Sequence, residues 1–125
     1  MASTAKKLLI PAGLIALLLA AIAALAEENI KVITKTLIGS EAHKECVNVS
    51  EDQKLRYWYR AEKPIDFVIQ YVDGKKTLYP VRRDKEALGS GSFAPTSAQT
   101  YCMVWTNPDR QAVLFRVEFA RLPRL

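Results

Sequence analysis

Few residues in this sequence are suited to catalysis or metal binding. His43 is the only histidine, and it stands three residues before Cys46. A His-x-x-Cys pair with Met103 could form half of a metal site, but the chain offers too few further ligands to complete one. A Ser or Cys nucleophile would need His43 as its base, and no Gly-x-Ser-x-Gly elbow or phosphate-binding loop is present. We therefore expect no metal, no cofactor and no enzymatic activity.

A short aromatic segment offers chemistry for binding instead. In Tyr57-Trp58-Tyr59, the alternation of a strand places Trp58 on the same face as Arg56 and Arg60. Trp and Arg are enriched among the residues that dominate binding at protein interfaces. The alternative is a central strand with both faces partly buried, in which the arginine stems cover the indole ring. Arg56, Trp58 and Arg60 are candidates for contact with a partner.

A second candidate binding region is rich in positive charge. The basic residues between positions 75 and 85 are Lys75, Lys76, Arg82, Arg83 and Lys85, and only Asp84 and Glu86 balance them. Because residues 80–100 are mostly polar and contain prolines and glycines, we expect a long connection there. The basic residues could be solvated, or they could contact anionic lipid headgroups or an acidic protein partner.

Composition separates the chain into two unlike parts. Of 125 residues, 50% are hydrophobic, and 18 Lys and Arg against 13 Asp and Glu give a formal charge of +5. Residues 8–26 carry no charge and follow Lys6 and Lys7. A basic start, an apolar stretch and alanines at its end are the parts of a secretory signal. Without the two lysines, 16 basic residues against 13 acidic ones leave +3, which does not indicate a nucleic-acid-binding protein.

The apolar stretch is also long enough to cross a membrane. As a helix, residues 8–26 would span about 28 Å, close to the thickness of a hydrocarbon core of about 30 Å. In either case the preceding lysines stay in the cytoplasm and the rest of the chain is exported, out of reach of nucleic acid. We expect an anchor helix over residues 1–26 and a periplasmic domain over residues 27–125. Cleavage after Ala26, which would release a soluble periplasmic or secreted protein, is the alternative.

The exported domain carries strand signals and no sustained helical periodicity. Alternating apolar residues, separated by turn residues such as Asp73-Gly74 and Asn107-Pro108, predict a series of strands. The expected strands are 30–38, 55–60, 65–72, a short run at 77–79, 100–106 and 111–119. Residues 61–64 are expected to end strand 55–60 and to separate it from strand 65–72. Strands at this spacing favour an all-β fold, an antiparallel β-sandwich.

The order of these features resembles the GOLD domain, the lumenal β-sandwich of Golgi-dynamics cargo receptors, from about Ile33 to Phe119. The similar features are Cys46 after the first strand, the paired strands 55–60 and 65–72 with Asp73-Gly74, the segment 89–95, Tyr101-Cys102 before Trp105-Thr106-Asn107, and a final strand 113–119. The resemblance implies two sheets, a disulfide between Cys46 and Cys102, and a binding role without catalysis. Cargo receptors of this family carry a coiled coil and a membrane span after this domain. This sequence ends at Leu125, and its one apolar stretch stands at the start. We therefore do not expect their trafficking role here.

A disulfide also agrees with export, because two cysteines in an exported domain most often pair. A disulfide between Cys46 and Cys102 would close a loop of 57 residues. In the chain-entropy model, closing a loop of that length stabilises a domain by about 4 kcal/mol. The disulfide therefore has a structural role in this expectation.

These features predict a non-catalytic, membrane-anchored interaction or structural module on the periplasmic face, as an accessory subunit of a larger membrane protein complex. Its partners would be the membrane, through residues 8–26, the other subunits, and anionic lipid headgroups. The alternative is a cleaved, free module that captures a peptide or glycan through Trp58 and residues 75–86.

Overall fold

The computed structural model describes residues 30–124. The expected signal or anchor helix of residues 1–26 lies outside this range. Among the described residues there is no helix, and hence none that is long and apolar enough to cross a membrane. For this part of the chain the prediction of an all-β fold is confirmed.

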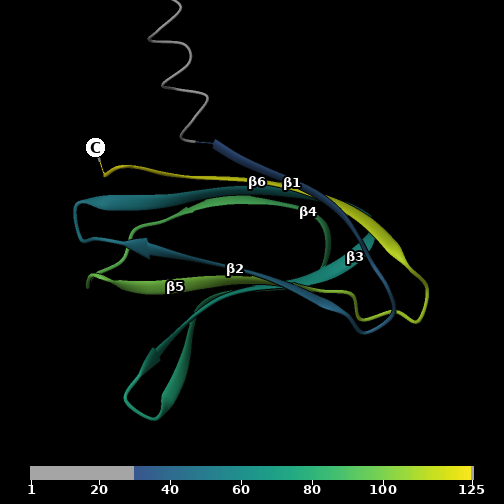
Figure 1. Cartoon of the computed structure of the whole chain (residues 1–125), viewed down its shortest axis with the longest axis horizontal. Helices are drawn as coiled ribbons and strands as arrows, with labels where there is room; N and C mark the ends of the chain where they lie inside the picture. The colour runs from purple at the N-terminus through teal and green to yellow at the C-terminus, as the bar shows by residue number, and fades with distance from the viewer. Residues whose placement is uncertain (1–29, 125) are drawn as a thin grey trace, which may run out of the picture. The chain divides into compact units, whose positions relative to one another are not determined.

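Six strands form one curled sheet that folds over into two layers (Figure 1). Their order is β1-β6-β3-β5-β2, and β4 pairs with the remaining edge of β3. The paired ladders of β2, β3, β4, β5 and β6 are antiparallel. The strands are β1 (Ile30–Leu37), β2 (Ala42–Val49), β3 (Gln53–Asp73), β4 (Lys76–Phe93), β5 (Gln99–Thr106) and β6 (Val113–Pro123).

β3 takes part in both layers because it is long and bent. Residues 53–61 of β3 pair with β6, and residues 66–70 pair with β5. β4 follows β3 along nearly its whole length. We call the layer of β1, β6 and the first part of β3 layer 1, and the layer of β2, β5 and the second part of β3 layer 2. This is the two-layer arrangement of a sandwich, joined by the bent β3–β4 pair.

The structure corrects the expected break at residues 61–64. These residues continue β3 through the bend, and a shift of register between Arg60 and Ile65 marks a bulge there. Pro64 cannot donate a backbone hydrogen bond, and no neighbouring strand pairs with it. The proline is therefore tolerated inside a strand at the point where the chain passes from one layer to the other.

The expectation of a long connection over residues 80–100 is also wrong for most of that stretch. The short run expected at 77–79 belongs to β4, which continues to Phe93. β4 is an edge strand, so many of its side chains face water and are polar. Its inward positions beside the rings of Tyr59 and Tyr57 are Gly89 and Gly91, where a Cβ atom would overlap each ring. These inward positions of β4 are therefore occupied by glycines and not by large apolar residues. As a result, the sequence of β4 lacks the apolar alternation that predicts a strand.

β2 is a strand that the sequence did not predict. It is an edge strand that pairs with β5, from Ala42 opposite Thr106 to Val49 opposite Gln99. Among its inward positions only Val49 is fully buried, while His43 and Glu45 are half-buried and polar. The strand therefore lacks the apolar alternation by which strands are recognised.

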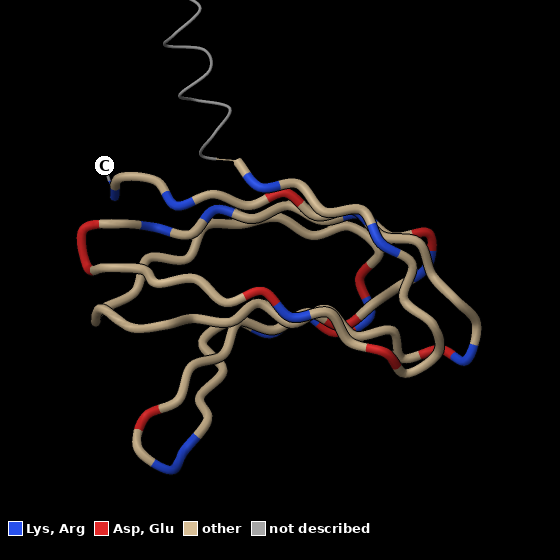
Figure 2. The backbone as a smooth tube through the Cα atoms, viewed as in Figure 1, with Lys and Arg blue, Asp and Glu red and all other residues tan. Residues whose placement is uncertain are grey.

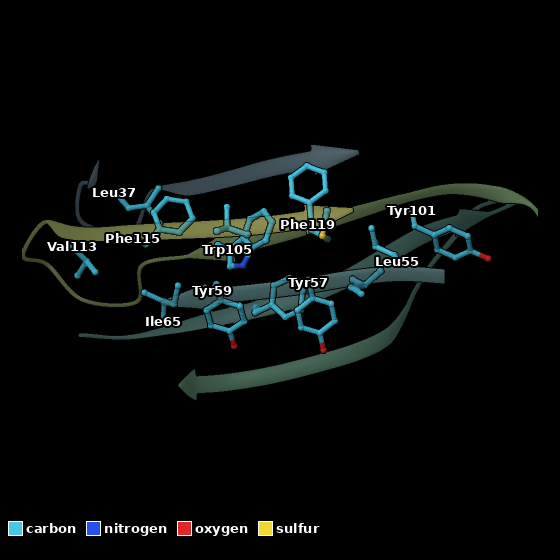
Figure 3. Close-up of a cluster of buried hydrophobic side chains, with 14 of the residues drawn as sticks. Leu37, Leu55, Tyr57, Tyr59, Ile65, Tyr101, Trp105, Val113, Phe115 and Phe119 are labelled. Atoms are coloured by element: carbon cyan, nitrogen blue, oxygen red, sulfur yellow. The ribbon is translucent and has the colours of Figure 1, made fainter. Parts of the chain in front are cut away.

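The core lies between the two layers, and the strands supply it by alternation, as expected (Figure 3). Phe67 occupies its middle, with ring centroids 4.7 Å from Tyr57, 5.1 Å from Tyr59 and 5.3 Å from Trp105. The other core side chains of these strands include Leu55, Ile65, Ile69, Met103, Val113, Phe115 and Val117. The predicted inward faces of residues 55–59, 65–69 and 113–119 are confirmed.

Candidate functional site

The two cysteines form a disulfide, as predicted. Cys46 of β2 lies directly opposite Cys102 of β5, with 4.0 Å between the Cα atoms. The bond joins neighbouring strands within layer 2, on the side that faces away from the core. It ties the edge strand β2 to the layer.

His43 is half-buried at an inward position of β2, beside side chains of both layers. Its Nε2 atom is 3.0 Å from Oε1 of Glu45, and its ring centroid is 6.2 Å from that of Trp105. Glu45 also accepts a hydrogen bond of 3.2 Å from Nζ of Lys31 in β1. Among the described residues, no cluster of three His, Cys, Asp or Glu side chains is present that could hold a metal.

Arg56, Trp58 and Arg60 share the outer face of layer 1. The two arginines are exposed, and Trp58 is half-buried between Glu118 of β6 and Ser90 of β4. Glu118 is 3.2 Å from Arg116, the residue directly opposite Arg60. The face is therefore of mixed charge, and the indole is partly covered by its neighbours.

The five basic residues between 75 and 85 do not form one patch. Lys75 and Lys76 lie at the turn between β3 and β4, which Gly74 makes possible with a φ of 64°. Arg82 places its guanidinium 5.1 Å from the ring centroid of Tyr79. Lys85 has a positive φ of 54° and donates its backbone N–H to Asp66. The two lysines at the turn, Arg82 and Lys85 therefore lie in three different environments.

Arg83 is tied into the domain. Its guanidinium donates to Glu86 at 3.2 Å and to the carbonyl oxygen of Ser90 at 2.9 Å. The hydrogen bond to Glu86 raises the pKa of Arg83. The guanidinium also lies 6.0 Å from the ring centroid of Tyr57. Arg83 therefore stabilises the bend of β4 and is less available to a partner than the lysines at the turn.

The end of the β3–β4 pair projects from the body of the domain as a hairpin (Figure 1). We call residues 72–79 the projecting hairpin. Val72 is 61% exposed and Tyr79 is 47% exposed, and Leu78 beside them is also exposed. Lys75 and Lys76 give its tip a positive charge, next to Asp73 (Figure 2). The hairpin thus combines apolar side chains with lysines and contributes no fully buried residue to the core.

A groove at the base of this hairpin was missed by the sequence reasoning. It consists of two adjoining hollows of about 450 Å³ each, which share Ala98, Gln99 and Thr100. One hollow lies against the hairpin and is lined further by Lys44, Gln70, Tyr71, Val72 and Cys102. The other is lined further by Asn48, Val49, Ser50, Gln53 and Arg121. We call the two together the basal groove. Its residues come from β2, β3, β5, β6 and the loops between them, so no local motif marks it.

No protein-family model matches this chain, and no curated protein matches it. Solved structures do resemble it in fold. The mitogen derived from Yersinia pseudotuberculosis has a TM-score of 0.54 at 14% identity, over 74% of this chain and 85% of that one.

Two further structures are similar. PliG of Aeromonas hydrophila, a periplasmic inhibitor of g-type lysozyme, has a TM-score of 0.52 at 11% identity, over 74% of this chain and 86% of that one. TmCBM61, solved with β-1,4-galactotriose, has a TM-score of 0.50 at 11% identity, over 78% and 83%. At these identities the likeness shows a shared β-sandwich fold. None of the three is named a GOLD domain, so the resemblance to that family stays a prediction.

Proposed function

We propose that this chain is a non-catalytic interaction module with a GOLD-like β-sandwich, exported to the periplasm and anchored by residues 8–26. It serves as an accessory subunit of a larger membrane protein complex. The disulfide between Cys46 and Cys102 supports export, because disulfides persist in oxidising compartments. The pairing of Cys46 with Cys102 is also the one that the GOLD resemblance implies.

The projecting hairpin is the observation that carries the proposal. Val72, Leu78 and Tyr79 expose apolar surface on a segment that leaves the body of the domain. Exposed apolar groups on a protrusion gain stability when a partner removes them from water. Lys75 and Lys76 form no ion pair with any residue from 30 to 124. They would orient the hairpin toward an acidic partner surface.

A substitution in the hairpin tests this contact. Membranes are solubilised in a mild detergent, and the mass of the assembly that contains the full chain is measured by native electrophoresis. We expect the wild-type chain to migrate with a high-mass complex and Tyr79→Ser to shift a large part of it to the free form. Leu114→Ser is the matched control, because Leu114 is 43% exposed on the other layer. Migration of the wild type as a free monomer would count against the proposal.

A released binding module is the second candidate. Among the described residues, the core is built from side chains between Leu37 and Ala120. For this candidate we expect the domain to keep its fold after cleavage. Sequencing the N-terminus of the mature protein separates the two: a start at Glu27 excludes the anchored form, and a start at Met1 or Ala2 excludes the released one.

A further inference from the structure

The basal groove has the polar chemistry of a site for a hydroxyl-rich ligand. Its two hollows have volumes of about 450 Å³ each, and both are shallow and open to solvent. Four side-chain amides and three side-chain hydroxyls line them, namely those of Asn48, Gln53, Gln70, Gln99, Ser50, Thr100 and Tyr71. Amides and hydroxyls both donate and accept hydrogen bonds, as the hydroxyl groups of a sugar do.

Several of these side chains are held in place by one hydrogen bond and keep further capacity. Thr100 donates its hydroxyl to Oδ1 of Asn48 at 2.6 Å, and the backbone N–H of Ser50 donates to Oε1 of Gln53 at 3.1 Å. The amide nitrogens of Asn48 and Gln53 then have no acceptor among residues 30–124, and neither has the side chain of Gln70. The Asn48 and Gln53 side chains are fixed but unsaturated, so they lose little freedom when a ligand binds.

The charge of the groove is positive. Lys44 lines one hollow and Arg121 lines the other, and no Asp or Glu is among the described residues that line either. Arg121 uses one N–H for the carbonyl oxygen of Asn48 at 3.0 Å, and its other donors remain. Lys44 forms no ion pair within residues 30–124. A ligand with acidic groups would complement both ends of the groove.

The floor of the groove favours a glycan over a peptide. β5 pairs with β2 along the groove, and it pairs with β3 only as far as Cys102. Its unpaired edge is therefore limited to residues 99–101, which is short for the addition of an extended peptide as a strand. The lining also lacks a deep apolar pocket for an anchoring side chain, because Val72 and the half-buried Tyr71 are the larger apolar groups in it.

We propose that the basal groove binds an acidic oligosaccharide. Asn48, Gln53 and Gln70 donate hydrogen bonds to its sugar hydroxyls or accept them, while Lys44 and Arg121 bind its anionic groups. The site lies at the base of the projecting hairpin and includes Val72, whereas Leu78 and Tyr79 of the proposed protein contact do not line the groove. It goes beyond the proposed function and does not depend on it.

A glycan array tests the proposal with the full chain in detergent, detected through a C-terminal tag. The array carries uronic-acid, sialylated, sulfated and neutral oligosaccharides. We expect binding to a subset of the acidic glycans, weakened about fivefold by Lys44→Gln and by Gln70→Ala, since each removes one or more hydrogen bonds to the ligand. Lys76→Gln is the matched control, because it removes the same charge at the hairpin tip and should leave binding unchanged.

Other results would overturn the proposal. These are retention of no acidic glycan, equal retention of neutral glycans, unchanged binding by both groove variants, or an equal loss in Lys76→Gln. Full displacement of the glycan by a hexaglutamate peptide would also overturn it, since the groove would then select charge alone. Tyr79→Ser should keep glycan binding even where it releases the chain from a complex, so failure here is distinguishable from failure of the proposed function.

Discussion

The Tyr59 hydroxyl is fully buried and has no hydrogen-bond partner among the residues that the structure describes. A buried polar group without a partner costs free energy, while its ring packs well against Phe67. We expect Tyr59→Phe to raise the free energy of unfolding by about 1 kcal/mol, because it removes the hydroxyl and keeps the ring. Urea denaturation followed by circular dichroism measures this, with Tyr57→Phe as the neighbouring control.

Tyr59 should also make the free energy of unfolding depend on pH in the alkaline range. Burial, with a further effect of Glu86, raises the pKa of Tyr59 from 10.0 to about 12. Below pH 10 the hydroxyl keeps its proton in both states. Between about pH 10 and 12 the unfolded chain loses the proton first, so the wild type should lose about 2–3 kcal/mol of stability there. A loss equally large in Tyr59→Phe would show that another group is responsible.

At the scale of elements, β2 depends on the disulfide more than on its own side chains. Its inward residues supply one fully buried side chain, Val49, and within residues 30–124 it forms a ladder with β5 alone. Replacing Cys46 and Cys102 together by alanine should cost up to about 4 kcal/mol by the chain-entropy model. Hydrogen exchange should show β2 losing protection before β3 and β6 do. Uniform loss across all strands would mean that β2 is held mainly by packing. Lys44→Gln, also on β2, is the control for an outward substitution.

Particular residues explain which elements could be predicted from the sequence. The strands within 55–72 and 100–119 were found because apolar side chains alternate there and are buried in the core. β4 was mistaken for a connection because Gly89 and Gly91 leave room for the tyrosine rings. β2 was missed because His43 and Glu45 form a polar pair at inward positions. Patterning reveals strands that bury apolar side chains, and it overlooks edge strands that do not.

The candidate sites show the same limit at the scale of the whole molecule. The Arg56, Trp58 and Arg60 face could be predicted, because i and i+2 positions of one strand share a side. The basal groove could not, since its residues are brought together by the curl of the sheet and the pairing of β2 with β5. The hairpin turn at Gly74 was predicted, but its projection from the domain follows from the bend of β3.

The two layers should unfold as one unit because a single aromatic cluster joins them. Phe67 belongs to layer 2 and contacts Tyr57 and Tyr59 from layer 1, while Trp105 of layer 2 has its ring centroid 6.0 Å from that of Phe115 in layer 1. We expect Phe67→Ala to lower the free energy of unfolding by about 3–5 kcal/mol, through lost burial and the cavity that remains. Tryptophan fluorescence and far-ultraviolet circular dichroism should still give the same denaturation midpoint. Val68→Ala, at the next, half-buried position on the outer side of β3, should cost much less. Separate midpoints for the two probes would show that the domain does not unfold as one unit, contrary to this expectation.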